Sequence, residues 1–237
     1  MVTSIYEDKT YLDKNPSWHE EDSPWKASQV VKMLRKQRLD VGSVADVGCG
    51  VGEVLSQVCS ELRGNLLADD AVFHGYDVST HAIERAREKV APGLEFFAED
   101  LFETGKRYDL LMAIDVFEHV PDYLGFLSKC RDAAKYKLYH IPLDINVLSV
   151  MRRKFRDYRK DVGHLHHFTA DTALATLADT GHTVIDYFYT DGAISLAHLH
   201  PSYRKRLANS VRRPVSYFST PLAALVLGGF SLMVLAE

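Results

Sequence analysis

Three glycines within five residues follow a short apolar segment, and this junction restricts the possible folds more than any other feature. Ser43–Val47 is typical of a buried strand, glycines stand at positions 48, 50 and 52, and Glu53–Leu62 has the spacing of a helix. Glycine lets such a turn approach a ligand closely because no Cβ intervenes. A dinucleotide fingerprint needs its third glycine at position 53, where Glu53 stands instead. The loop therefore disfavours NAD and favours a ligand with an amino-acid tail.

Strand and helix patterns alternate along the rest of the chain. Further strands are predicted at residues 72–78, 94–98, 108–116, 136–142 and 183–189, and further helices at residues 80–90, 122–134 and 169–180. This alternation is typical of an α/β fold with a mostly parallel sheet and right-handed crossovers. Residues 1–237 are therefore predicted to form a single domain.

Two segments do not fit the alternation. Residues 1–40 are predicted to form an N-terminal helical cap, in which Ser23 caps a helix that Pro24 opens. Trp18 and Trp25 in this cap either face a ligand or pin the helix to the sheet. Residues 143–168 are polar and basic and are interpreted as a lid or insertion, whose cations either bind an anionic substrate or form a solvated helix face.

Charge and cysteine content narrow the classes of function. The formal net charge is −4, so no global positive field favours nucleic acid, and a nucleic-acid partner is not expected. Cys49, Cys59 and Cys130 form no C-x-x-C pair. An odd, unpatterned set of cysteines favours reduced thiols and a cytoplasmic location.

The C-terminal segment allows two interpretations. Residues 217–236 contain no charged residue and follow a basic stretch, which is long enough for a bilayer span with a positive flank. Pro221 and the Gly228–Gly229 pair instead favour a short helix over residues 220–227 and a buried strand over residues 230–236. We favour the strand and expect no membrane partner, with a membrane-tethered protein as the alternative.

Acidic side chains stand where several predicted strands end. Asp77 follows the second strand, Asp100 the third, and Asp115 closes the fourth. Open α/β sheets bind ligands at the carboxyl ends of adjacent parallel strands. At these ends Asp77 is suited to accept hydrogen bonds from both ribose hydroxyls, and Asp100 from an adenine amino group.

These residues carry a resemblance to a known family. Residues 44–53, 75–79, 98–102 and 108–121 resemble motifs I to IV of class I methyltransferases that use S-adenosylmethionine (SAM), in the small-molecule branch. Residues 163–169 and 177–184 resemble the segment before the sixth strand of that family. The resemblance implies a Rossmann-like sheet of seven strands whose last strand is antiparallel, with residues 230–236 as the candidate. It also implies SAM as cofactor and S-adenosylhomocysteine as product.

The resemblance assigns cofactor-binding roles by position. The glycines would lie beside the methionine moiety, and Asp115 would lie near the methionine end. Asp77 would hold the ribose, and Asp100 and Leu101 would hold the adenine. The cofactor-binding residues implied in this way are Asp46, Gly48, Gly50, Gly52, Asp77, Val78, Asp100, Leu101 and Asp115. The stretch between Gly52 and Asp77 is longer than expected, which leaves a larger loop at residues 65–70.

Several histidines surround the expected acceptor site. Methyl transfer from a sulfonium mainly needs alignment, whereas a hydroxyl acceptor also gains from a base that removes its proton. His119 is the first candidate for a catalytic or orienting role and His166 the second, while His140 is a further base candidate. His164 and His167 are interpreted as lid or surface residues. The sequence therefore predicts methyl transfer to a small-molecule acceptor, with oxygen favoured over nitrogen.

Two other functions remain open. Residues Asp115 to His119 also resemble the E-x-x-E-H of metal-assisted O-methyltransferases, which include quinone-pathway enzymes and small-RNA 2′-O-methyltransferases. Asp115 is shorter than the expected glutamate, and metal-free relatives share the E-H-V-P turn, so no metal is predicted. The alternatives are a metal-assisted RNA 2′-O-methyltransferase and a non-catalytic SAM-binding protein.

Overall fold

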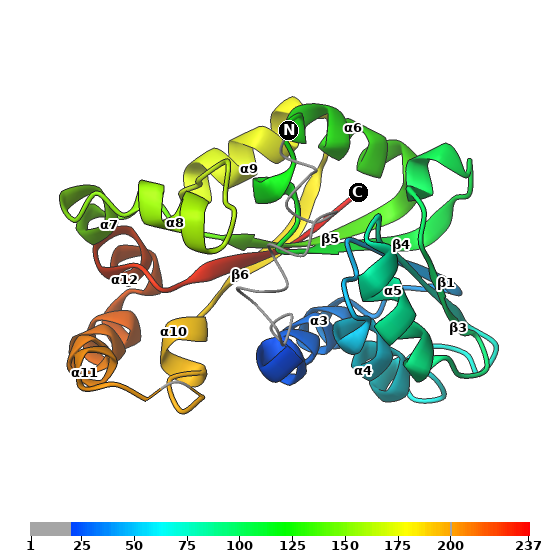
Figure 1. Ribbon diagram of the computed structural model, residues 1–237, viewed down its shortest axis with the longest axis horizontal. Helices are drawn as coiled ribbons and strands as arrows, with labels where there is room; N and C mark the ends of the chain where they lie inside the picture. The colour runs from blue at the N-terminus through cyan, green and yellow to red at the C-terminus, as the bar shows by residue number, and fades with distance from the viewer. Residues whose placement is uncertain (1–19, 200) are drawn as a thin grey trace.

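Seven strands form one sheet in the order β3-β2-β1-β4-β5-β7-β6 (Figure 1). Neighbouring strands among β1 to β5 pair in parallel, and β7 is antiparallel to both β5 and β6. The strands are β1 (Ser43–Val47), β2 (Val72–Tyr76), β3 (Leu94–Phe97), β4 (Tyr108–Ile114), β5 (Ala134–Pro142), β6 (Val184–Thr190) and β7 (Ser231–Ala236). The predicted seven-stranded sheet with an antiparallel last strand is confirmed.

The structure, a computed structural model, describes residues 20–199 and 201–237. Trp18 and the first half of the predicted cap lie outside these residues. The helices that cover the sheet are α3 (Ser23–Gln37), α4 (Glu53–Leu62), α5 (Thr80–Ala86), α6 (Tyr123–Ala133), α9 (Ala170–Asp179) and α12 (Thr220–Leu227). The peripheral helices are α7 (Val147–Met151), α8 (Phe155–Asp161), α10 (Gly192–Ser195) and α11 (Tyr203–Phe218). Short 3₁₀ turns are η1 (Glu20–Asp22), η2 (Arg87–Lys89), η3 (Leu101–Glu103) and η4 (Phe117–His119).

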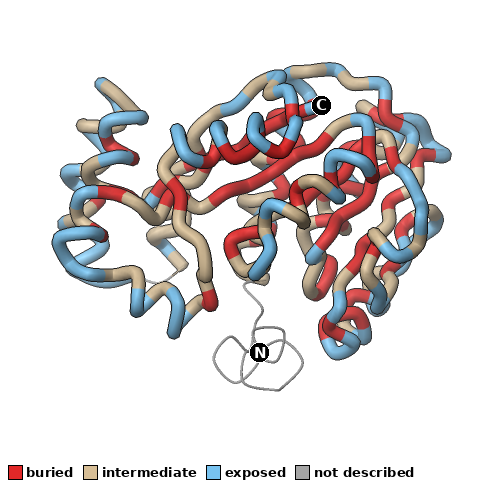
Figure 2. Tube along the Cα trace, turned by 90° about the horizontal axis from the view of Figure 1, so that it is seen from above, coloured by how far each residue is buried: buried red, intermediate tan, exposed pale blue. Residues whose placement is uncertain are grey.

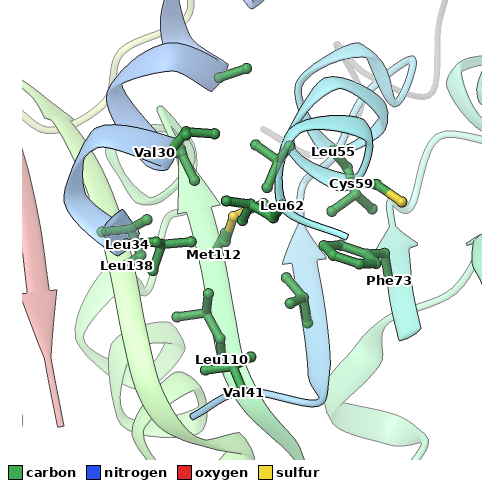
Figure 3. Close-up of a cluster of buried hydrophobic side chains, with 14 of the residues drawn as sticks. Val30, Leu34, Val41, Leu55, Cys59, Leu62, Phe73, Leu110, Met112 and Leu138 are labelled. Carbon is green, nitrogen blue, oxygen red and sulfur yellow. The ribbon is translucent and has the colours of Figure 1, made fainter. Parts of the chain in front are cut away.

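Helices cover both faces of the sheet, so the central strands are buried on both sides. Buried side chains of α3, α4 and α5 form one core, and those of α6, α9 and α12 form the other. Figure 2 shows that the buried parts of the chain run through the middle of the molecule. In β4, Leu110 and Met112 face the first core while Leu111 and Ala113 face the second. Figure 3 shows Met112 beside Leu62 of α4 in the first core. This two-sided burial explains why β4 is apolar along nearly its whole length.

Helix α3 begins at Ser23, one residue earlier than predicted. Asp22 is the N-cap of α3, its side chain makes no capping hydrogen bond, and Ser23 is already helical. The prediction that Ser23 caps this helix is therefore wrong. Proline is tolerated at either of the first two helical positions because the N–H that it lacks would have no partner in the first turn.

The C-terminal segment folds as the favoured interpretation predicted. Helix α12 ends at Leu227, the chain turns at Gly228, and β7 then inserts between β5 and β6 as a fully paired strand. Across residues 20–199 and 201–237, no helix combines the length and apolarity needed to cross a membrane. Helices α10 and α11, which precede this segment, were not predicted.

Candidate functional site

The glycine loop joins β1 to α4 through three residues with positive φ. The φ angles of Gly48, Gly50 and Gly52 are 73°, 55° and 76°, a region that side chains with a Cβ rarely enter. A Cβ on Gly48 would lie 2.8 Å from the Val116 side chain, and one on Gly52 would lie 2.5 Å from the Phe96 ring. Both conformation and space therefore require glycine at these two positions.

Asp77 ties this loop to the end of β2. Its Oδ2 accepts a hydrogen bond from the Gly50 N–H at 2.9 Å, and its Oδ1 accepts one from the Ser79 N–H at 2.8 Å. Burial raises the pKa of Asp77, while the two N–H donors oppose this shift. Each carboxylate oxygen keeps a second lone pair, so Asp77 can bind a ligand and hold the loop at the same time.

Asp46, the second-to-last residue of β1, lies next to this carboxylate. It is almost fully buried, and burial together with the negative charge of Asp77 raises its pKa to about 8. Asp46 is therefore protonated at neutral pH and presents a hydroxyl donor as well as an acceptor. The two aspartates thus offer a ligand different hydrogen-bonding groups.

A cavity of about 710 Å³ lies at the carboxyl ends of β1, β2 and β4, where an open parallel sheet is expected to bind ligands. Asp100 accepts a hydrogen bond from the Phe102 N–H there, and the side chain of Leu101 is buried beneath it. Eight of the nine predicted cofactor-binding residues line this cavity: Asp46, Gly48, Gly50, Asp77, Val78, Asp100, Leu101 and Asp115. Gly52 lies behind the wall, against Phe96.

Asp115 connects the cavity to the N-terminal helix. Its φ is 56°, its Oδ1 lies 2.6 Å from His140 Nδ1, and its Oδ2 lies 3.0 Å from Lys26 Nζ. Lys26 also reaches Asp22 at 3.5 Å, and His140 Nε2 lies 2.9 Å from the Thr190 hydroxyl. Although burial opposes ionisation of Asp115, His140 and Lys26 hold its pKa below the usual value. Lys26 lines the cavity and was not predicted as a binding residue.

Glu118 and His119 follow on the 3₁₀ turn η4. Glu118 is buried, and within the described part of the chain neither of its carboxylate oxygens has a hydrogen-bond partner. Burial and the nearby Asp115 raise the pKa of Glu118 well above its usual value. Burial and His164 lower the pKa of His119 to about 4, so its imidazole is neutral at neutral pH. His119 lines the cavity, where a neutral imidazole offers one nitrogen that can accept a hydrogen bond.

The three later histidines differ in their positions relative to the cavity. His164 lines the cavity with its ring centroid 4.9 Å from that of His119, and Asp144 Oδ2 accepts from His164 Nδ1 at 2.6 Å and from His167 Nδ1 at 2.9 Å. His164 and His167 are therefore largely buried rather than surface residues, and their place in a lid stays a prediction. His166 is outside the cavity wall, because its Nε2 donates to the Val120 carbonyl at 3.0 Å. This placement does not support the predicted catalytic role of His166.

The sheet order, the antiparallel β7 and the cavity behind a glycine loop together define the class I methyltransferase fold. Residues 18–187 match a family model described as a methyltransferase domain. That range is more than half of the chain, and the chain therefore belongs to this family. The predicted methyltransferase family is confirmed.

Sequence relatives are similar to only part of the chain. A ubiquinone biosynthesis O-methyltransferase from Cereibacter sphaeroides is 32% identical over 90 residues, which is 38% of this chain and 36% of that protein. Pavine N-methyltransferase from Thalictrum flavum subsp. glaucum is 23% identical over 217 residues, 84% of this chain and 59% of that protein. The chain thus spans about a third of the length of the first of these relatives.

Solved structures support the same fold at low sequence identity. The N-methyltransferase NodS from Bradyrhizobium japonicum WM9, with S-adenosylhomocysteine, has a TM-score of 0.59 at 15% identity and covers 97% of this chain and 98% of that one. Magnesium protoporphyrin IX methyltransferase from Synechocystis PCC 6803, also with S-adenosylhomocysteine, has a TM-score of 0.57 at 16% identity, with coverages of 92% and 82%.

Proposed function

We propose that this protein transfers the methyl group of SAM to an oxygen atom of a small-molecule acceptor. One observation carries the proposal: the predicted cofactor-binding side chains and His119 line the same cavity. The relatives include a ubiquinone biosynthesis O-methyltransferase, which supports oxygen as the acceptor atom.

The two ends of the cavity suit the two ends of SAM. Asp77 and Asp100, at the ends of β2 and β3, would accept hydrogen bonds from the ribose and the adenine. Lys26 and Asp115 place one cation and one anion 3.0 Å apart at the cavity wall. The amino-acid end of SAM carries an ammonium and a carboxylate, which would pair with Asp115 and Lys26 respectively. This complementarity supports this end of the cavity as the site of the methionine moiety.

His119 is the proposed base. The acceptor hydroxyl would give its proton to the neutral imidazole, the oxygen lone pair would form the bond to the methyl carbon, and the bond from that carbon to the sulfonium sulfur would break. S-adenosylhomocysteine then leaves without the sulfonium charge. The Asp144–His164 pair beside His119 would keep the imidazoles oriented.

The proposal is tested with SAM carrying a deuterated methyl group and a panel of phenols, sugars and amines. We expect mass spectrometry to find the label on oxygen, and His119→Gln to lower kcat by about a hundredfold or more with an unchanged Kd for S-adenosylhomocysteine. Label on nitrogen, or full activity of the variant, would contradict the proposal. Tight SAM binding with no turnover on any acceptor would favour the non-catalytic alternative.

A second candidate is a metal-assisted reaction, and one observation favours it. Ligand atoms of Glu118, His119 and His164 lie within 4.8 Å of one another, and the Glu118 oxygens have no described hydrogen-bond partner. His164 Nδ1 is held by Asp144, as metal-binding imidazoles commonly are by a carboxylate. These three side chains could hold a divalent cation that acidifies the acceptor hydroxyl.

Calorimetry with Zn²⁺ or Mn²⁺ separates the two candidates. The metal-assisted candidate requires a heat of binding that Glu118→Gln removes and that His166→Gln, outside the cavity, leaves unchanged. Full activity after treatment with a chelator, without cation binding, would exclude it.

The predicted location is supported by the thiols. Cys49, Cys59 and Cys130 are all free, and two of them are buried. Free thiols are typical of a reducing compartment, so we infer a cytoplasmic location. Labelling the protein in intact and in permeabilised cells with a thiol reagent that does not cross membranes tests this inference.

A further inference from the structure

Helix α11 presents its apolar stripe to solvent rather than to the protein. Tyr203, Leu207, Val211, Pro214 and Phe218 recur every three or four residues, so they share one side of the helix. Tyr203, Leu207 and Phe218 are 80%, 59% and 86% exposed. A surface helix normally buries such a stripe, and large exposed apolar groups mark an interaction site.

The opposite side of α11 is polar and holds the helix to the protein. Asn209 is buried and donates to the Ala193 carbonyl at 2.7 Å, while Arg212 donates to the carbonyls of Leu227 and Gly228. The polar side faces inward because these backbone carbonyls at the ends of α10 and α12 need donors. The apolar stripe is therefore fixed in an outward orientation.

Cations surround this stripe. Arg204, Arg206 and Arg213 are exposed beside it, and residues 203–236 contain no aspartate or glutamate. This local charge is opposite in sign to the net charge of −4 of the whole chain. An exposed apolar stripe flanked by arginines is complementary to an anionic lipid surface, where apolar side chains enter the interface and cations pair with headgroups.

Neighbouring helices enlarge the surface. Leu222 and Leu225 of α12, which packs against α11, are each 52% exposed, and Met151 of α7, which packs against α12, is 74% exposed. Figure 1 shows α7, α11 and α12 together at the end of the molecule opposite β3. We call this exposed surface the distal face. It consists of the apolar side chains Tyr203, Leu207, Val211, Tyr217, Phe218, Leu222 and Leu225 and the cations Arg204, Arg206 and Arg213.

Helix α11 is linked through its anchoring contacts to a second cavity beside the site. A second cavity of about 240 Å³ is lined by Gly229, Phe230 and residues of α10. It shares Pro142 and Ser231 with the larger cavity. The turn that anchors Arg212 of α11 leads directly into this shared wall. The helix that carries the distal face is therefore anchored on the segment that forms the wall shared by the two cavities.

We propose that the distal face docks the protein onto the surface of an anionic lipid bilayer, with α11 lying in the plane of the interface. The side chains of α11 and α12 supply the apolar contact, and the three arginines supply the attraction to acidic headgroups. This docking requires no spanning segment, and it does not depend on the proposed reaction. It goes beyond the sequence analysis, which expected no membrane partner.

Co-sedimentation of the full chain with vesicles, without SAM, tests the proposal. We expect binding to phosphatidylcholine vesicles that contain about a third phosphatidylglycerol, and much weaker binding to pure phosphatidylcholine. Replacing Arg204, Arg206 and Arg213 with glutamine should weaken binding by about fivefold for each cation removed. Leu207→Ser with Phe218→Ser should weaken it at every salt concentration, because these side chains supply the apolar contact.

Matched controls lie elsewhere on the surface. Lys135→Gln removes an exposed cation, and Val90→Ser removes an apolar side chain that is 53% exposed; both should bind vesicles like the wild type. Circular dichroism would show that every variant is folded, because all the altered side chains are exposed.

Three outcomes would overturn the proposal. The first is no binding of the wild type to anionic vesicles, or equal losses in the control variants. The second is that the wild type binds no vesicles but binds single-stranded RNA in a salt-dependent way, and that the arginine variant loses this RNA binding. The distal face would then be a nucleic-acid interface. The third is self-association in light scattering that Phe218→Ser removes, again without vesicle binding.

Discussion

Asp46 and Asp77 lie side by side at the glycine loop, and their surroundings give them different chemistry. Burial raises the pKa of Asp77, but the two backbone N–H bonds that it accepts oppose this shift and favour its charged form. Asp46 is buried next to that charge, and its pKa rises to about 8. Since two neighbouring carboxylates with separated pKa values can take different roles, the cavity offers a ligand one charged acceptor and one neutral donor.

The first prediction concerns the stability that Asp46 confers. Its folded pKa of about 8 lies above its ordinary value of 3.8, so the stability that it contributes is full below pH ~4 and is lost as the pH rises to ~8. We expect Asp46→Asn to gain stability relative to the wild type as the pH rises, by ~1 kcal/mol or more at pH ~8. Urea unfolding at several pH values measures this difference, and a difference that does not change with pH would contradict the assignment.

The second prediction concerns the ribose acceptor. Asp77→Asn should weaken S-adenosylhomocysteine binding by roughly tenfold or more, because it removes the charged acceptor and disturbs the Gly50 contact. Calorimetry measures the Kd. Asp69→Asn, in the exposed loop before β2, is the matched control and should leave the Kd unchanged. Equal affinities of the wild type and Asp77→Asn would remove Asp77 from the cofactor site.

At the scale of elements, the turns after the strands decide the site. β2 and β4 end at Tyr76 and Ile114, two residues earlier than predicted, and the residues that follow them, Asp77 and Asp115, line the cavity. Asp115 does so with a φ of 56°, which aspartate tolerates better than most residues. At these strand ends the backbone still pairs with the neighbouring strand, because the Asp77 and Asp115 N–H groups donate to the carbonyls of Phe97 and His140, while the side chains line the cavity.

The third prediction separates backbone strain from crowding in the glycine loop. Gly52→Ala meets both a φ of 76° and a Cβ contact of 2.5 Å with Phe96, whereas Gly105→Ala meets a φ of 68° with nothing within 4 Å. We expect Gly105→Ala to cost about 1 kcal/mol of unfolding free energy and Gly52→Ala at least 1 kcal/mol more. Urea denaturation gives both values, and equal losses would show that Phe96 can move aside.

At the scale of the whole molecule, the cavity joins elements that are distant in the sequence. Lys26 of α3 contacts Asp115 after β4, which contacts His140 of β5, which in turn contacts Thr190 of β6. A ligand at this junction would therefore contact both helix α3 and the sheet. A compound that binds only the folded state stabilises the whole protein.

The fourth prediction is thermal stabilisation by the cofactor product. S-adenosylhomocysteine at about a hundred times its Kd should add ~2.7 kcal/mol to the free energy of unfolding. Differential scanning calorimetry should show a rising Tm as the ligand concentration rises. NAD at the same concentrations is the control, because Glu53 stands where the dinucleotide loop needs glycine. An unchanged Tm with S-adenosylhomocysteine would refute the cofactor site.

The sequence by itself determined the sheet, the glycine loop and the acids that line the cavity. Each of these is a local pattern: apolar strands, glycines at fixed spacing, and carboxylates at strand ends. The apolar C-terminal segment was also predicted correctly, because Gly228 and Gly229 separate helix α12 from strand β7.

Tertiary structure alone decided the rest of the site. The ring nitrogens of the later histidines are held by partners from other segments: Asp144 holds His164 and His167, and the Val120 carbonyl holds His166. The outward direction of the apolar stripe of α11 is likewise tertiary, because the Asn209 and Arg212 contacts that fix it join the helix to other segments. Local spacing predicts elements, whereas the direction in which a side chain points is set by partners that the sequence places far away.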